Sequence, residues 1–237
     1  MFGNLDTLES AYLRYANQQL FRYVAVRVQT DINAKDFAAR PVSPAEATGL
    51  RASVHTAMRR GADAQAMIAA SRKADPRSPA SYAAEAVGLD GAGKRDEARA
   101  AYAKAVEFEL KNFYVYYRLA ALNWRADADA ELRASLEKWV RQSIALNDAY
   151  MPAYLFLAET QAAANPAAAV DTASKAVGLK PRAAAPRLSL ARALMRSSRP
   201  DVARAHARAA LGLAGSDEEK KEAQALLDAI ERAAARP

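Results

Sequence analysis

Cysteine is absent from this sequence of 237 residues. Disulfide bridges and thiolate metal sites are therefore excluded, while the cytoplasm and the periplasm both stay open as compartments. Histidine is nearly absent too, because only His55 and His206 occur, and they have neither the H-E-x-x-H nor the Cys/His spacing of a metal site. We expect His55 in a packing position between helices and His206 on the surface. No catalytic residues, metal or other cofactor are expected.

Long apolar runs are also missing. No segment is long enough to span a bilayer, and residues 1–19 lack the apolar core of an export signal. Glycine is scarce, at 9 residues, and β-branched residues concentrate in one short segment near the N-terminus. The remaining composition, rich in alanine and arginine, favours an all-α fold.

Small residues recur along the chain at an almost fixed interval. The steps are 34, 38 and 33 residues, between Ala86, Ala120, Ala158 and Ala191. Periods in this range indicate an array of helical repeats in which each unit packs only on its neighbours. The small residues let paired helices approach closely, and Tyr102 and Val140 are predicted to fill the space between pairs.

Helix-start signals divide the chain into units. Ser43, Pro44 and Glu46 form a strong helix start, and Ser216 with Glu219 forms a second capping box before the last helix. Between them we expect five helix pairs, at 46–60 with 63–74, 79–92 with 95–110, 113–124 with 129–146, 152–164 with 166–179, and 186–197 with 200–213. The last helix, to about residue 236, has the charged outer face of a terminal cap.

Residues 1–42 follow a different pattern. A helix is expected at about 7–20, a strand or extended arm at 21–32, and a linker at 33–41. A lone strand needs a partner for its backbone groups. The sequence thus predicts three parts: an N-terminal helix and arm (1–42), a repeat array (43–215) and a capping helix (216–237).

The repeated residues resemble the tetratricopeptide repeat (TPR), whose pattern runs W-x2-L-G-x2-Y, then A-x3-F, then P. The resemblance covers about residues 45–213 and is strongest at Ala98, Tyr102 and Ala105, with Gly93 as the turn. It implies a right-handed superhelical array whose first helices line a concave, peptide-binding face. Some family members hold a carboxylate with a Lys/Asn clamp, which is not reproduced here because the corresponding positions hold Ala83, Val87, Tyr117 and Ala121.

The phase of the repeat identifies the side chains that would line the concave face. Aromatic and arginine residues anchor interfaces most often, and Arg192 and Arg196 lie one turn apart, as suits a carboxylate. We therefore expect a protein or peptide partner of acidic character. The alternative is that Tyr117 and Leu155 are partly core and that the arginines are simply exposed. The predicted partner-binding residues are Tyr114, Tyr117, Trp124, Arg125, Leu155, Glu159, Leu188, Arg192, Met195 and Arg196.

The third unit is irregular. It has 16 positions between Ala120 and Leu136 where the other units have 11 or 12, which predicts about one extra helical turn. The acidic residues Asp127, Asp129 and Glu131 lack the glycine and distal glutamate of a calcium loop, and a helix N-terminus explains their charge. The longer unit is either a contact site or an inert loop.

Basic charge is concentrated near the C-terminus. The net charge is +7, and residues 181–210 contain one acid, Asp201, and seven arginines, at 182, 187, 192, 196, 199, 204 and 208. This is either a solvated surface or a face for an anionic partner. Nucleic acid is disfavoured because aromatic residues do not alternate with the arginines. Gly88, Gly93 and Lys94 match part of a phosphate-binding loop, but Arg95 replaces the required Ser or Thr, so no nucleotide is expected.

Three functions remain open. The leading hypothesis is a non-catalytic scaffold or adaptor that binds a protein or an extended peptide on the concave face. In the second, residues 2–28 are similar to the end of a bacterial zinc metallopeptidase-like domain, and the chain is the substrate-recruiting or assembly segment of a longer protein. In the third, the N-terminal strand pairs between copies and forms a homo-oligomer.

Overall fold

The computed structural model describes residues 9–10, 41–125 and 127–234. Glu9 and Ser10 are helical, and the rest of the expected N-terminal helix, the strand at 21–32 and most of the linker at 33–41 lie outside the described residues. The two hypotheses that depend on the N-terminal segment therefore stay predictions.

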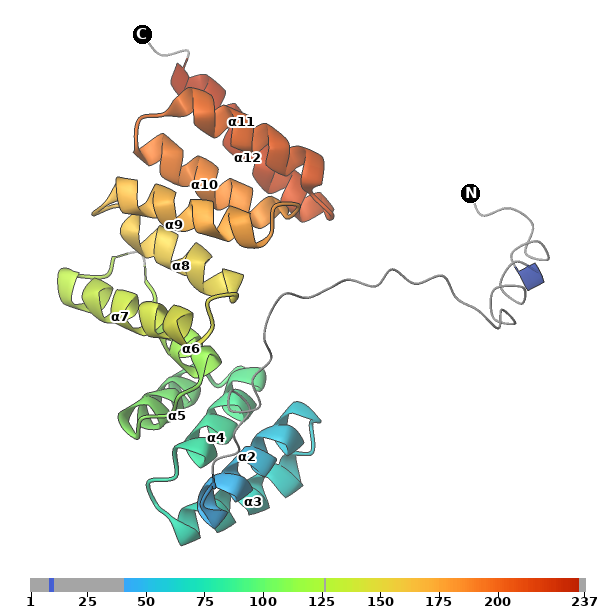
Figure 1. Cartoon of the computed structure of the whole chain (residues 1–237), viewed down its shortest axis with the longest axis vertical. Coiled ribbons are helices and arrows are strands. Elements are labelled where there is room, and N and C mark those ends of the chain that lie inside the picture. The colour runs from blue at the N-terminus through green and yellow to red at the C-terminus, as the bar shows by residue number, and fades with distance from the viewer. Residues whose placement is uncertain (1–8, 11–40, 126, 235–237) are drawn as a thin grey trace, which may run out of the picture. The chain divides into compact units, whose positions relative to one another are not determined.

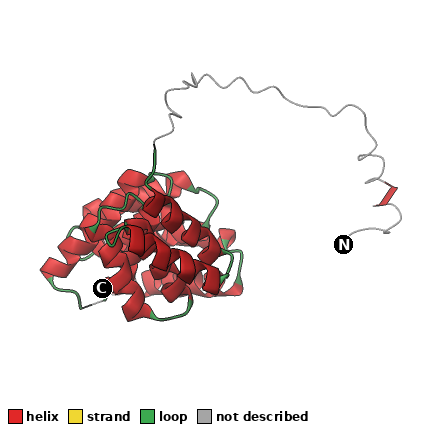
Figure 2. Ribbon diagram, turned by 90° about the horizontal axis from the view of Figure 1, so that it is seen from below, coloured by secondary structure: helices red, strands yellow, loops and turns green. Residues whose placement is uncertain are grey.

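The described part of residues 42–237 is built from helices and their connections (Figure 2). Figure 1 shows how they follow one another from α2 to α12. The bounds are α2 Pro44–Ala57, α3 Gly61–Ala74, α4 Pro79–Gly91, α5 Arg95–Glu107, α6 Phe113–Asn123, α7 Ala130–Leu146, α8 Met151–Gln161, α9 Pro166–Leu179, α10 Ala184–Arg196, α11 Pro200–Leu213 and α12 Asp217–Ala234. Within this range the five expected pairs and the capping helix are confirmed.

Methyl-sized side chains make the helix pairs possible. Ala86, Ala120, Ala158 and Ala191 are all buried, as the repeat phase predicts. Tyr102 and Val140 are fully buried beside them and belong to two successive core clusters. The core therefore continues from pair to pair, because each first helix lies between the helices of its own unit and those of the preceding one.

The predicted helix starts are present as hydrogen bonds. The Ser43 hydroxyl accepts from the backbone N–H of Glu46 at 3.1 Å, and Ser216 accepts from that of Glu219 at 3.2 Å. The Glu219 carboxylate in turn accepts from the backbone N–H of Gly215 at 2.7 Å. These bonds satisfy N–H groups that have no partner inside the helix.

Helices α2, α5 and α10 end one to three residues earlier than the sequence predicts. Arg59, Glu109 and Ser198, which follow them, have positive φ angles of 58°, 62° and 55°. Gly93 occupies the same conformation, with φ of 75°, after α4. A left-handed residue ends a helix and is usually glycine, so the sequence indicated the turn at Gly93 and not the other three.

The third unit is longer, as expected. Helix α7 has 17 residues, whereas α3, α5, α9 and α11 have 13 or 14. The connection that precedes α7, residues 124–129, is also long. Asp129 caps α7 by accepting from the backbone N–H of Leu132 at 2.8 Å, which accounts for an acidic residue here without a metal.

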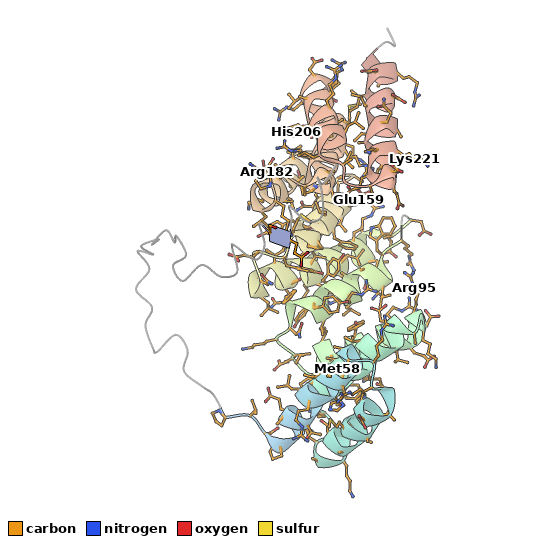
Figure 3. The ribbon with its side chains drawn as sticks, turned by 90° about the vertical axis from the view of Figure 1, so that its right-hand side faces the viewer. Met58, Arg95, Glu159, Arg182, His206 and Lys221 are labelled. Atoms are coloured by element: carbon orange, nitrogen blue, oxygen red, sulfur yellow. The ribbon has the colours of Figure 1, made fainter. Side chains whose placement is uncertain are left out.

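The two end helices of the array differ in character. The exposed positions of α12 are largely charged, as a cap requires. Helix α2 instead exposes Leu50 and Val54, four residues apart on one face, and Met58, directly after its last residue, is exposed as well (labelled in Figure 3). Of these two helices, α12 alone therefore has the polar outer face that the sequence predicted for a cap.

Helices α2 and α4 are in close contact at Gly49. A Cβ atom at this position would lie 2.8 Å from Ala80 Cβ and 2.8 Å from the backbone nitrogen of Ser81. Backbone atoms cannot rotate away as a flexible side chain can. Glycine is therefore required here by contact, while its φ angle is not in the left-handed region.

Replacing this glycine tests the contact. Gly49→Ala should lower the free energy of unfolding by about 1–3 kcal/mol, because the added methyl group overpacks the crossing. Gly178→Ala in α9 is the matched control, since a Cβ there meets nothing within 4 Å. It should leave stability unchanged or raise it by up to about 1 kcal/mol. Urea unfolding followed by circular dichroism measures both, and equal stabilities would contradict the proposed contact.

Candidate functional site

The ten predicted partner-binding residues separate into two groups along the array. Tyr114, Tyr117, Trp124 and Arg125 lie on α6 and just after it. The other six lie on α8 and α10, one and two units further along the chain. The structure therefore gives two stretches of surface with different character.

The first group is joined by aromatic residues that the sequence did not indicate. The ring of Tyr117 packs edge-on against Tyr150, at 5.2 Å between centroids, and against Phe156, at 6.2 Å. Phe113 also packs on Tyr150, at 4.9 Å. Tyr117 is half-buried in these contacts, so the interpretation of Tyr117 as partly core describes it better than that of a free contact residue.

Tyr114 and Trp124 are the accessible aromatic members of this group. Their exposed fractions are 38% and 43%. Arg125 is exposed as well, and its Nε lies 3.8 Å from Asp127. Aromatic side chains of this size that stay exposed beside a packed cluster are suited to contact with a partner.

A partly buried ion pair anchors the helix that carries the first group. Arg118 of α6 donates two hydrogen bonds of 2.6 Å to the carboxylate of Asp90 in α4. Tyr102 of α5 donates to the same carboxylate at 3.3 Å. Hydrogen bonding to Asp90 raises the pKa of the Arg118 guanidinium, and burial, with the charge of Asp90, raises the pKa of the Tyr102 hydroxyl. Three helices are thereby fixed around one carboxylate.

The second group lines two adjoining hollows. One, of about 480 Å³, is bounded by Glu159, Arg192, Met195 and Arg196 and by residues of α12. The other, of about 330 Å³, shares Glu159 and Arg192 and adds Leu155. We call these two hollows together the inner groove. It brings all six predicted residues of α8 and α10 to one surface, although Leu188 contributes little.

Leu188 was predicted to contact a partner, but it is buried. Only 2% of its surface is exposed, and it packs with Ala184, Ala210 and Ala223. Leu188 borders the second hollow, but residues of α11 and α12 pack on its side chain. Because the sequence did not show where α12 would lie, the burial of Leu188 was not foreseen.

Helix α12 forms one wall of the inner groove. It contributes Leu226, Ala229 and Ile230 to one hollow and Glu222 to the other. In Figure 3, Glu159 of α8 lies on the same side of the array as Lys221 of α12. Leu226 and Ile230, four residues apart, form an apolar face of α12 that the sequence analysis, which considered only the charged outer face, did not identify.

Arg192 is not free to bind a carboxylate. Its Nη2 lies 2.5 Å from Glu222 Oε1, across the groove from α10 to α12. Among the described residues, Arg196 and Glu159 form no ion pair. Of the two arginines expected to face an acidic group, Arg196 therefore keeps its charge uncompensated.

Much of the basic charge of residues 181–210 is taken up within the chain. Arg192 pairs with Glu222, Arg208 with Glu231 at 3.6 Å and Arg204 with Asp201 at 3.1 Å, whereas Arg187 donates only to the neutral carbonyl of Pro181. The acids on α12 lie outside the stretch in which the arginines are concentrated, so the local count of charges overstated how basic this surface is.

His206 is half-buried in α11, whereas a surface position was expected. Its Nδ1 is buried without a hydrogen-bond partner among the described residues. Burial, with the positive charge of Arg187, lowers the pKa of its imidazole. His55 is half-buried, as expected, with Nδ1 3.4 Å from Asp63.

Sites for other ligands were sought in the described part of the chain. It contains no group of three or more His, Cys, Asp or Glu side chains placed to hold a metal ion. Gly88 lies inside α4 and Gly93 in the turn after it, so the apparent phosphate loop is not formed. Among the described helices, none combines the length and the apolar character that crossing a membrane requires.

Comparison with solved structures identifies the fold. YrrB, described as a TPR protein with an unusual peptide-binding site, superposes with a TM-score of 0.62 and 13% identity, over 74% of this chain and 90% of its own. The chain has a TPR fold. MamA gives a TM-score of 0.58 at 19% identity, over 76% and 94% of the two chains. TTC0263, a TPR protein of Thermus thermophilus, gives 0.52 at 20%, over 77% and 98%.

Sequence comparisons add no further relatives. A scan against protein-family models finds no match, and neither does a search of curated proteins. The likeness to TPR proteins is therefore one of structure at low sequence identity, and it establishes the fold alone.

The lowered pKa of His206 predicts a pH effect on stability. The imidazole binds a proton more weakly in the folded chain than in the unfolded one, whose pKa is about 6.5. The contribution of His206 to stability is therefore greatest above about pH 6.5 and is lost as the pH drops below that value. His206→Asn should lose less stability than the parent between about pH 7.5 and pH 5 in urea unfolding. Arg187→Gln should give an intermediate loss, and equal losses in all three would contradict the assignment.

Proposed function

We propose that this protein is a non-catalytic scaffold that binds a segment of a partner protein in the inner groove. The observation that carries the proposal is the pair of adjoining hollows between α8, α10 and α12, which share Glu159 and Arg192. A groove that holds its shape through helix packing loses little entropy when a peptide binds.

The chemistry of the groove defines the peptide. Met195, Leu226 and Ala229 offer apolar surface to one aliphatic or aromatic side chain. Arg196, which forms no ion pair with a described residue, offers its exposed cation to a carboxylate. The carboxylate of Glu159, which forms no ion pair with a described residue, lies in both hollows and can accept from backbone N–H groups of the peptide.

The structural neighbours are consistent with this role. YrrB is described as a TPR protein with an unusual peptide-binding site, and the superposition covers 90% of the YrrB chain. The accessible Tyr114 and Trp124 would extend the contact surface toward the third unit if the bound segment is long. That extension is part of the proposal and is tested separately from the groove.

The groove can be tested without knowing the natural partner. Peptides selected on the purified protein from a random phage library should bind Met195→Glu and Arg196→Glu at least about tenfold more weakly, because the apolar and the cationic contacts are then lost. Fluorescence anisotropy of the labelled peptides measures the affinity. Lys180→Glu, an exposed substitution outside the groove, is the control and should change binding by less than about twofold.

Two outcomes would oppose the groove. Selected peptides that bind both variants as tightly as the parent would place the site elsewhere. Peptides weakened only by Trp124→Ala and Tyr114→Ala would move it to α6. Circular dichroism on each variant checks that the helices are retained.

A further inference from the structure

A second hollowed surface lies along α7, away from the inner groove. A hollow of about 780 Å³ follows the exposed side of α7 as far as Ala164 in the α8–α9 connection. Its floor is lined by methyl groups, from Ala130, Ala134 and Ala145. A smaller hollow, of about 270 Å³, continues it between α7, α8 and α9 and shares Arg141 and Ala145. We call the two together the α7 furrow.

The charge of the α7 furrow is mainly basic. It is lined by Arg133, Lys138, Arg141 and Lys175, against the single acid Glu137. Glu137 already accepts from Arg141 at 3.1 Å. Arg133, Lys138 and Lys175 form no ion pair with any described residue. This differs from the C-terminal arginines, several of which are neutralised within the chain.

A buried amide holds the central arginine in place. Gln161 is only 4% exposed. With its nitrogen donating to Thr172 Oγ1 at 2.8 Å, its oxygen accepts from Arg141 Nη2 at 2.9 Å. The guanidinium is thus fixed where the two hollows meet, while 58% of the Arg141 side chain stays exposed. A cation held in this way loses less side-chain entropy on binding than a free one.

We propose that the α7 furrow binds an acidic segment of a partner protein. The carboxylates of that segment pair with Arg133, Lys138, Arg141 and Lys175, and its small side chains lie on the alanine floor. The length of α7, roughly 25 Å at about 1.5 Å per residue, accommodates about five turns of helix. Charge complementarity selects the acidic partner, and the added length of the third unit provides the surface.

The lining favours a polypeptide over nucleic acid. Binding of single strands relies on aromatic platforms that stack on bases. The aromatic residue of the furrow is Tyr154, which is half-buried where α8 meets α7 and α9. Methyl groups make up much of the floor, and they suit close approach of a helix or a main chain.

Binding of a designed acidic peptide tests the furrow. The probe is a fluorescein-labelled peptide of about 15 residues of repeated Glu-Ala-Ala, measured by anisotropy at low salt. Arg133→Glu with Lys138→Glu and Lys175→Glu should weaken its binding at least about tenfold. The matched control reverses three exposed lysines elsewhere, Lys73→Glu, Lys111→Glu and Lys180→Glu, and should weaken it less than about threefold. Both triple variants have the same net charge, so a difference between their affinities for the probe reports only where the substituted residues lie.

Other results would overturn the proposal. Equal weakening by both triple variants would show that binding follows net charge, and no binding by the parent at low salt would remove the site. A single-stranded oligonucleotide of equal charge that binds more tightly and displaces the peptide would assign the surface to nucleic acid. If the furrow triple variant unfolds, Arg133→Gln with Lys138→Gln and Lys175→Gln replaces it. Met195→Glu, which disrupts the inner groove, should change probe binding less than about threefold, so the two sites fail or succeed independently.

Discussion

Close contact between helices through methyl-sized side chains is the constraint on which the rest of this structure depends. Ala86, Ala120, Ala158 and Ala191 are buried where paired helices meet, and at Gly49 even a methyl group is too large. Larger side chains would separate the helices and break the continuous core. Because packing uses these small residues, the remaining faces of each helix can carry charge, aromatic rings or hollows without loss of the fold.

The capping helix contributes both to the stability of the array and to the proposed binding surface. Helix α12 buries Ile230 and Leu227 against the preceding pair and presents Glu222 to Arg192. The ion pair is about half exposed, so its contribution to stability is small, at most about 1 kcal/mol. Its main effect is on the inner groove: it fixes the position of Arg192 and leaves Arg196 as the cation that the proposed peptide carboxylate would meet.

The repeat period made the helices and the core predictable, because burial at Ala120 or Val140 depends only on the phase within one unit. The groove was less predictable, since Leu188 and Arg192 are defined by contacts with α11 and α12. Tyr150 and Phe156 were missed for the same reason: their packing on Tyr117 joins neighbouring units. Helices α2 and α5 are followed by Arg59 and Glu109 in the left-handed conformation. Glycine is the residue that usually indicates this conformation in a sequence, and neither position holds one.

The irregular third unit affects both proposed surfaces. Its long connection places Trp124 in an exposed position, and its long second helix lines the α7 furrow. The inner groove lies mainly on first helices and α12, whereas the furrow lies mainly on α7, with residues of α8 and α9 at one end. The two surfaces share no lining residue, so the two proposed binding sites do not overlap. Simultaneous binding would raise the effective concentration of one partner near the other.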